Sequence, residues 1–139
     1  RMVIKEAMRL YPPVAIIDRM ANADIELGDG VRVEKGDLAF ALIYVMHRHK
    51  LLWDNPERFD PDRFAPEHAE RHHRFQYMPF GAGPRICIGM KFAYMEAVAM
   101  LGTLVRALKF GPNPAHQVVP NIRITLRPEG GMPLYAEKR

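Results

Sequence analysis

The stretch Phe80-Gly81-Ala82-Gly83-Pro84-Arg85-Ile86-Cys87-Ile88-Gly89 contains the only cysteine of the 139-residue sequence. Its glycines let the backbone adopt positive φ angles and approach a flat partner closely. A long apolar segment follows, so Cys87 stands just before a helix start, where free N–H groups and the helix dipole favour a thiolate over a thiol. Arg85 adds a positive charge nearby. A thiolate in a loop that excludes water is a soft, strongly donating metal ligand.

The residues around Cys87 decide between two interpretations of this side chain. A lone cysteine is usually a small buried hydrophobic residue. The metal ligand is favoured here, because the stretch 80–89 carries the required residue at every fixed position of the signature Phe-x-x-Gly-x-Arg-x-Cys-x-Gly. That signature is typical of the haem-thiolate family, and the chain therefore resembles the cytochromes P450.

The resemblance implies that Cys87 is the axial ligand of the iron in haem b. It also implies that Phe80 packs near the sulfur, and that backbone N–H groups after Cys87 hydrogen-bond to the sulfur and tune the redox potential of the iron. Arg19 resembles the family's arginine that pairs with a haem propionate, and Arg85 is expected to do the same, since arginine offers two donors to a carboxylate. A solvated surface arginine is the alternative for both. The implied haem contacts are Phe80, Gly83, Arg85, Ile88, Gly89 and Arg19.

A second motif lies at the start of the sequence. Residues 1–10 have the apolar spacing of an amphipathic helix, which the prolines of Tyr11-Pro12-Pro13 end. Glu6 and Arg9 are three residues apart and so share a face of that helix, which by itself indicates only a surface ion pair. Because these two residues match the family's Glu-x-x-Arg, the resemblance implies a buried, structural pair instead.

A buried ion pair needs further partners to offset the cost of its desolvation. The family pattern Phe-x-Pro-x-Arg-Phe is met by residues 59–64, which makes Arg63 the expected third member of a triad with Glu6 and Arg9. Arg58, from a neighbouring Pro-acidic-Arg-Phe copy, is the alternative.

Two segments between these motifs form the predicted scaffold. The apolar segment 14–17 is predicted to be a buried strand, and residues 24–43 a small antiparallel unit with turns at 28–30 and 34–36. The resemblance implies that the first segment lies on the substrate side of the haem. It therefore contains three candidate substrate contacts, Val14, Ala15 and Ile16.

The proline-rich segment 54–79 has little periodicity, and the resemblance implies an ordered meander across the face where redox partners dock. Three basic residues are candidate docking charges, with solvated surface charges as the alternative: Arg71, Arg74 and Lys91. The histidines of His47-Arg48-His49 and His72-His73 lack convincing ligand spacing, so no second metal site is predicted.

After Gly89, apolar spacing predicts a helix to about Leu108. It is apolar on most sides and is therefore expected to be buried. Gly111-Pro112 is expected to end it. Beyond it, segments 122–126 and 134–136 are predicted to be strands on either side of a turn at 128–131.

Composition narrows the function classes. A net charge of +4 is compatible with nucleic acid, an anionic membrane surface or an acidic protein. The scattered basic residues lack interleaved aromatic residues, which argues against nucleic acid and favours an acidic electron-donating protein. One cysteine excludes an intramolecular disulfide, which suggests a reducing compartment, here the cytoplasm. No apolar run reaches the length of a membrane span.

The sequence thus predicts the C-terminal portion of the mainly α (α+β) cytochrome P450 fold, with residues 1–139 as the haem-binding part of a single domain. Its expected order is a truncated helix, a small antiparallel β unit, a proline-rich meander, the cysteine loop, a long buried helix and a terminal β hairpin. The sequence starts at Arg1 inside a helix, and members of the family are much longer, so an N-terminal part is expected to be absent.

The resemblance implies a monooxygenase that activates dioxygen and inserts one oxygen atom into a small, apolar organic substrate. Electrons would come from NAD(P)H through a ferredoxin or a flavin reductase. The family's distal helix, with its acid and alcohol for proton delivery, is not in the sequence, so the isolated chain is expected to hold haem poorly and to be inactive. The alternatives are a haem-thiolate isomerase or dehydratase of the same fold, and a haem-free basic binding module.

Overall fold

The computed structural model describes residues 1–139, apart from the side chains of residues 69 and 70. It begins with helix α1 (Met2–Leu10), which confirms the predicted amphipathic helix. The Tyr11 N–H donates to the Ala7 carbonyl at 2.7 Å and closes the last turn before the prolines. Helix α1 packs against the short 3-10 helix η1 (Pro61–Phe64) of the meander.

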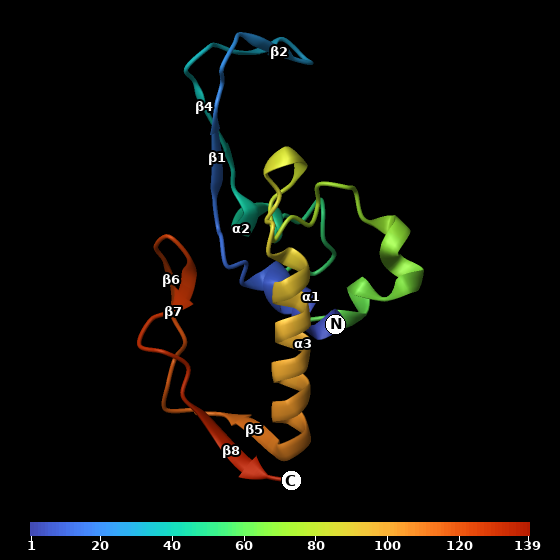
Figure 1. Cartoon of the computed structure of the whole chain (residues 1–139), viewed down its shortest axis with the longest axis vertical. Helices are drawn as coiled ribbons and strands as arrows, with labels where there is room; N and C mark the ends of the chain where they lie inside the picture. The colour runs from blue at the N-terminus through green and yellow to red at the C-terminus, as the bar shows by residue number, and fades with distance from the viewer.

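A long antiparallel arm follows α1 and extends away from the rest of the chain (Figure 1). Strand β1 (Ile17–Met20) pairs with β4 (Leu38–Ala41), and β2 (Ile25–Leu27) pairs with β3 (Val31–Val33) towards the tip. The tight turn between β2 and β3 uses positive φ angles of 61° at Asp29 and 75° at Gly30. The predicted antiparallel unit is therefore present.

The partner of β4 differs from the expectation for this unit. It is β1, which lies before residue 24, and β1 begins only at Ile17. The segment 14–16 precedes the strand: Ala15 is buried, whereas Val14 and Ile16 are exposed. The carbonyl of Ala15 accepts a hydrogen bond from the Tyr44 N–H at 3.0 Å, which ties the start of the arm to the next helix. The prediction of a buried strand over 14–17 was thus wrong in most of its residues.

The core lies where α1, α2 (Ile43–Met46) and the meander meet. The meander includes η1 and η2 (Pro66–Arg71). Buried apolar side chains here are accompanied by an unusual set of buried polar ones, because an ion pair and a histidine occupy the centre of the core. The buried residues among those described are Leu10, Pro12, Ala15, Ile43, Trp53, Ala65, Pro79, Glu6, Arg9, His47 and Gln76.

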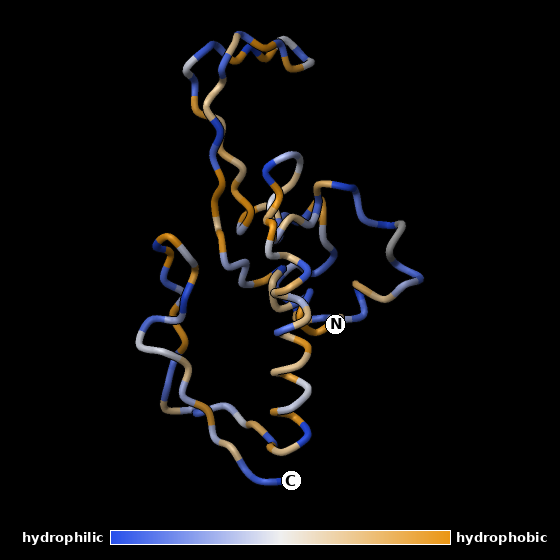
Figure 2. Tube along the Cα trace, viewed as in Figure 1, coloured by the Kyte–Doolittle hydropathy of each residue, from blue (hydrophilic) through white to orange (hydrophobic). Residues whose placement is uncertain are grey.

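Helix α3 (Met90–Ala107) follows η3 (Gly83–Arg85) and forms as predicted, yet no residue of α3, which the structure describes in full, is buried. Figures 1 and 2 show it as a long rod with apolar positions along its length, leading from the core to the C-terminal strands. The expected burial fails because these 139 residues supply few elements that pack along the helix. Phe92, for example, remains 64% exposed.

The C-terminal strands pair differently from the expectation. Strand β5 (Leu108–Pro112) continues directly from α3 and pairs with β8 (Leu134–Lys138), so Gly111-Pro112 lies in a strand and not at a helix end. Strands β6 (Pro120–Ile122) and β7 (Leu126–Pro128) form the terminal hairpin. The segment 122–126 therefore spans its turn. Among the described residues, no helix combines the length and apolar character needed to cross a lipid bilayer.

Candidate functional site

The cysteine loop is closed by its own backbone. The Cys87 N–H donates to the Phe80 carbonyl at 3.0 Å, and the Ile86 N–H donates to the Gly83 carbonyl at 3.1 Å. Gly81 and Gly83 have φ angles of 73° and 72°, a region that side chains with a Cβ rarely adopt. These contacts turn the chain so that the exposed thiol of Cys87 stands two residues before Gly89, the N-cap of α3.

A cavity of about 260 Å³ lies beside this loop and has mainly apolar walls. It brings together five of the residues predicted from the sequence, although they come from two segments that lie about sixty residues apart in the chain. These are Val14, Arg19, Phe80, Arg85 and Cys87. A thiol, two arginine side chains and an apolar wall match the three chemical parts of a haem, which are its iron, its propionates and its flat ring. The residues present therefore fit the group.

Not every predicted contact lines the cavity. The side chain of Ile88 is fully exposed, and Gly83, Gly89, Ala15 and Ile16 are likewise outside the lining. Gly89 still lies against the sulfur, since a Cβ built there would be 3.8 Å from Cys87 Sγ.

Six further lining residues were not predicted as contacts: Pro13, Ile17, Ile43, Met78, Pro79 and Gly81. Pro13 and Ile17 flank the three predicted contacts at 14–16, Met78 and Pro79 precede the loop, and Gly81 lies within it, so proximity in sequence was a usable signal for these five. Ile43 carries no such signal, because only the fold brings α2 beside the loop.

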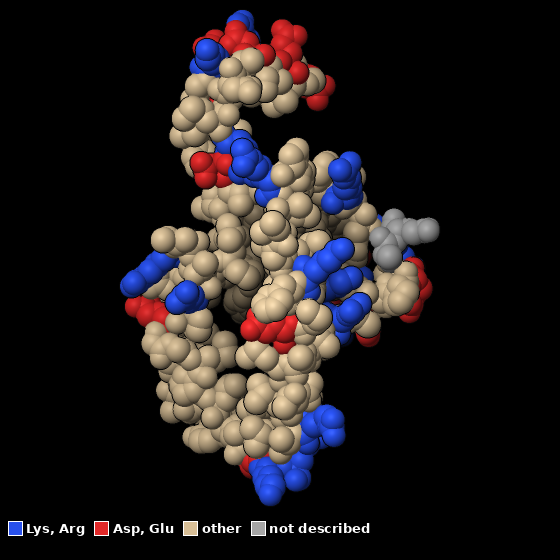
Figure 3. All heavy atoms as spheres, in the orientation of Figure 1, with Lys and Arg blue, Asp and Glu red and all other residues tan. Residues whose placement is uncertain are grey.

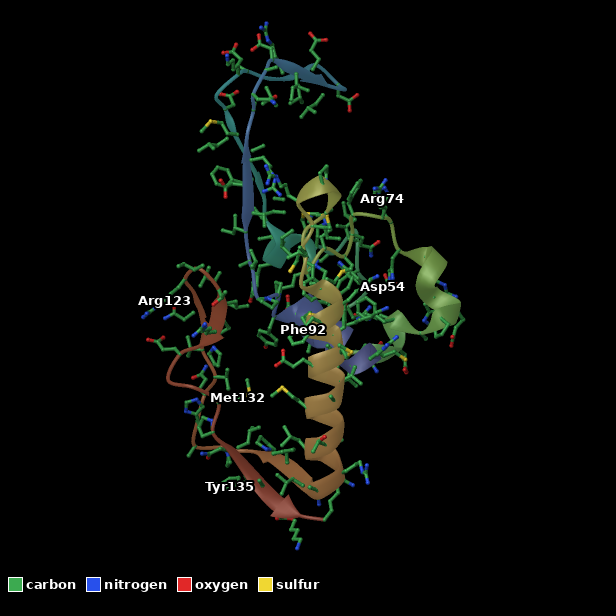
Figure 4. The ribbon with its side chains drawn as sticks, in the orientation of Figure 1. Asp54, Arg74, Phe92, Arg123, Met132 and Tyr135 are labelled. Atoms are coloured by element: carbon green, nitrogen blue, oxygen red, sulfur yellow. The ribbon has the colours of Figure 1, made fainter. Side chains whose placement is uncertain are left out.

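A larger, almost wholly apolar cavity of about 540 Å³ lies between α1, α3 and the terminal hairpin. Its lining includes Met8, Leu101, Leu126 and Met132, and Figure 4 shows Met132 on the C-terminal segment that faces α3. The lining contains none of the predicted site residues and little that could bind iron or transfer a proton. The smaller cavity at Cys87 is therefore the candidate site.

Behind the cysteine loop, Glu6 and Arg9 form a wholly buried ion pair. Arg9 Nε lies 2.7 Å from Glu6 Oε2, and Arg9 Nη2 lies 2.8 Å from Glu6 Oε1. Glu6 Oε1 also accepts the Asp60 N–H at 2.8 Å, and Arg9 Nη1 donates to the His47 carbonyl at 2.7 Å. These partners from the meander and α2 offset the desolvation of both charges.

The third member of this cluster is Arg63, whose Nε lies 3.5 Å from Glu6 Oε1. Its Nη2 donates to the Asn55 carbonyl at 3.0 Å, which holds the guanidinium beside the pair. Arg58 takes a different part, because only its backbone carbonyl reaches the cluster, where it accepts from Arg9 Nη2 at 3.1 Å. The structure thus places the side chain of Arg63, and not that of Arg58, against Glu6.

His47 is a buried polar residue whose place the sequence did not reveal. Burial lowers its pKa to about 4, despite some opposing effect of the nearby backbone of Arg9 and Met8. Its Nε2 accepts the Met78 N–H at 2.9 Å. Tyr77 stacks on its ring, and burial strongly raises the pKa of that phenol. Among the described residues, no cluster of histidine, cysteine and acidic side chains is arranged to hold a metal ion.

Basic side chains gather over the meander and the start of α3 in the view of Figure 3. Arg71, Arg74 and Lys91 are all exposed. Arg74 lies at the outer edge of the meander (Figure 4), with its guanidinium 5.0 Å from the centre of the Phe75 ring. Their exposure leaves them accessible to a partner, and a docking role for them stays a prediction.

Comparison with known proteins agrees with this geometry. The family model for cytochrome P450 matches residues 1–133. The chain is 39% identical over 134 residues to cytochrome P450 4B1 of Rattus norvegicus, a match that covers 96% of this chain and 26% of the relative. It is also 39% identical over 138 residues to cytochrome P450 4V2 of Homo sapiens, covering 99% of this chain and 26% of that protein.

Among solved structures, the chain is similar to the cytochrome P450DA heme domain, with a TM-score of 0.91 and 30% identity. The match covers 99% of this chain and 30% of that one. The chain spans about a quarter of the length of the curated relatives it matches. The cysteine loop, the buried Glu6–Arg9 pair and these likenesses lead to one assignment: the chain belongs to the cytochrome P450 family.

Proposed function

We propose that this chain is the haem-binding part of a haem-thiolate monooxygenase, in which the Cys87 sulfur would bind the iron. The observation that carries the proposal is the cavity beside the cysteine loop. It combines the Cys87 thiol with the side chains of Arg19 and Arg85 in otherwise apolar surroundings. Family membership supports the same reaction class.

In this proposal Cys87 Sγ would hold the iron, and Arg19 and Arg85 would pair with the two propionates. Both arginines are exposed, so their guanidinium groups can turn to a ligand without breaking a buried contact. The apolar side chains of Ile17 and Ile43 line the same cavity and would exclude water from the ring and the sulfur once the group is bound. When bound, the haem supplies dioxygen activation and the transfer of one oxygen atom, and a thiolate ligand favours O–O cleavage.

The proposed substrate is a small, apolar organic molecule, and Val14 is its candidate contact, because it alone of the three predicted residues lines the cavity. Electrons come from NAD(P)H through a ferredoxin or a flavin reductase. The net positive charge and the exposed basic side chains of the meander support an acidic partner on that face. The 139 residues alone are proposed to bind haem weakly and to be inactive, since α3 is left uncovered.

The test is incubation of the complete haem-loaded protein with labelled dioxygen, NADPH, a reductase and a panel of small alkyl and aromatic compounds. The proposal predicts products with one labelled oxygen atom, formed only with the reductase and abolished by Cys87→Ser. Met95→Leu is the control, because it removes a sulfur from an exposed position on α3. A product that forms in the absence of the reductase and carries no labelled oxygen would instead identify the isomerase or dehydratase.

A further inference from the structure

The ring of His47 links the buried ion cluster to the segment that leads into the cysteine loop. The residue has no exposed surface, and its backbone carbonyl accepts a hydrogen bond from Arg9 Nη1 at 2.7 Å. Its ring stacks on Tyr77, with 5.3 Å between ring centres and an angle of 25° between planes. Tyr77 is anchored in turn, because its hydroxyl donates to the Lys5 carbonyl at 2.9 Å. His47 and Tyr77 are therefore each anchored to α1 by one hydrogen bond.

From His47, a series of backbone hydrogen bonds runs to the cysteine. His47 Nε2 accepts the Met78 N–H at 2.9 Å. The carbonyl of the same Met78 accepts the Gly81 N–H at 3.0 Å, which forms the turn that opens the loop. The carbonyl of Phe80, the residue before Gly81 in that turn, accepts the Cys87 N–H at 3.0 Å. Three consecutive hydrogen bonds thus connect the imidazole to the backbone of Cys87.

This arrangement requires one protonation state of the ring. Since Nε2 accepts from a backbone N–H, the imidazole must be neutral, with its proton on Nδ1. Burial and the positive charges of Arg9 and Arg48 disfavour the imidazolium, and the pKa of His47 is lowered accordingly. Nδ1 finds no hydrogen-bond partner among the described residues. The ring is therefore held by its stacking on Tyr77 and by the bond from Met78, with the backbone of Met8 and Arg9 nearby.

We infer that His47 is a positioning residue for Cys87: its neutral Nε2 holds the Met78 backbone and thereby transmits the rigidity of the Glu6–Arg9 cluster to the cysteine loop. The significance of the loop for iron binding rests on the proposed function, whereas the restraint on the loop backbone does not. The acceptor atom is what matters, so a side chain that places an oxygen near the position of Nε2 should preserve the effect.

Two substitutions separate the acceptor from the volume of the ring. His47→Leu fills the site without an acceptor and leaves the half-buried Met78 N–H without its partner. His47→Gln retains an amide oxygen that can accept from it. His49→Leu is the matched control, since His49 is exposed and its side chain bonds only to the nearby Leu51 N–H among the described contacts.

Amide hydrogen exchange of the complete haem-loaded protein reads the restraint directly. In His47→Leu, exchange over residues 78–87 is expected to rise about tenfold or more, while His47→Gln and His49→Leu keep it within about threefold of the parent protein. Unchanged exchange in His47→Leu would overturn the inference, and so would a His47→Gln variant that exchanges as fast as His47→Leu. If His47→Leu does not fold, the comparison of His47→Gln with the parent protein decides by the same threshold.

The carbon-monoxide difference spectrum of the reduced protein adds a second readout. His47→Leu should lower the fraction of protein with the strongly red-shifted Soret band, and His47→Gln should restore it. If Cys87→Ser leaves that band unchanged, the proposed function fails, yet the exchange result still stands or falls by itself. An intact band in a His47→Leu variant with fast exchange would show that the restraint does not serve the ligand, which overturns the positioning role.

Discussion

Arg9 and Glu6 meet through two parallel hydrogen bonds of 2.7 and 2.8 Å, with both side chains wholly buried. Such a pair is stabilising only as long as both members are present, because the loss of one leaves the other charge buried without compensation. The partners that surround the pair come from the meander and α2, so this one contact joins three separate segments of the chain.

Removing the negative charge of the pair should therefore be costly. Glu6→Gln is expected to lower the free energy of unfolding of the complete protein by about 3–5 kcal/mol and to abolish haem retention. Glu57→Gln is the matched control, because the Arg48–Glu57 pair is 3.3 Å long and 74% of the Glu57 side chain is exposed. Because the Glu57 carboxylate is largely in solvent, this pair should contribute at most about 1 kcal/mol. Denaturant unfolding and haem content measure both, and equal effects of the two substitutions would contradict the account.

Arg63 and Arg58 can be distinguished in the same assay. Arg63→Ala should reduce stability and haem retention, because its guanidinium lies beside Glu6 and bonds to Asn55. The expected loss is about 1–3 kcal/mol, smaller than for Glu6, since the contact with Glu6 is longer. Arg58→Ala should have little effect, as it keeps the backbone carbonyl that Arg9 uses. A larger loss from Arg58→Ala would show that the triad has been assigned to the wrong arginine.

His47 makes stability depend on pH in a defined window. Burial lowers its pKa from 6.5 to about 4, so between these values the unfolded chain binds a proton that the folded chain excludes. The contribution is fully present above pH 6.5 and is lost as the pH falls towards 4, by up to about 3 kcal/mol. His47→Gln should flatten the pH dependence of denaturant unfolding there. His72, whose pKa burial also lowers, leaves a smaller slope of the same sign; an unchanged slope in the variant would refute the assignment.

The first turn of the cysteine loop depends on a positive φ angle. Gly81 has a φ of 73°, where an added Cβ would cost about 1–2 kcal/mol of backbone strain, and that Cβ would also lie 3.9 Å from Ile17 Cδ1. Gly81→Ala should therefore weaken haem binding by about tenfold, measured by transfer of haem to a competing acceptor protein. Gly28→Ala is the control, because Gly28 has neither a positive φ nor any atom within 4 Å of an added Cβ. Equal haem transfer from both variants would contradict the role of this turn.

Local signals in the sequence predicted much of this structure. The apolar spacing of residues 1–10, the prolines after α1 and the glycines around Cys87 each act within a few residues, and the elements they predicted are present. The family pattern also selected Arg63 over Arg58, whereas the two similar Pro-acidic-Arg-Phe copies by themselves left both arginines as candidates.

What the sequence could not predict depends on contacts between distant segments. Strand β5 was missed because its partner β8 lies more than twenty residues further along the chain. The burial of α3 was expected from its apolar composition. Composition does not show, however, whether other segments of these 139 residues pack against the helix. His47 looked like one of several unremarkable histidines, because its hydrogen bond to Met78 spans 31 residues.

The central claim is that Cys87 binds the haem iron through its sulfur. The most direct measurement is the carbon-monoxide difference spectrum of the reduced, haem-loaded complete protein, recorded beside its Cys87→Ser variant. The account predicts a strongly red-shifted Soret band in the parent protein and its loss in the variant, because only a thiolate ligand donates enough electron density to cause it. A red-shifted band that survives the substitution would contradict the claim, since another residue would then hold the iron.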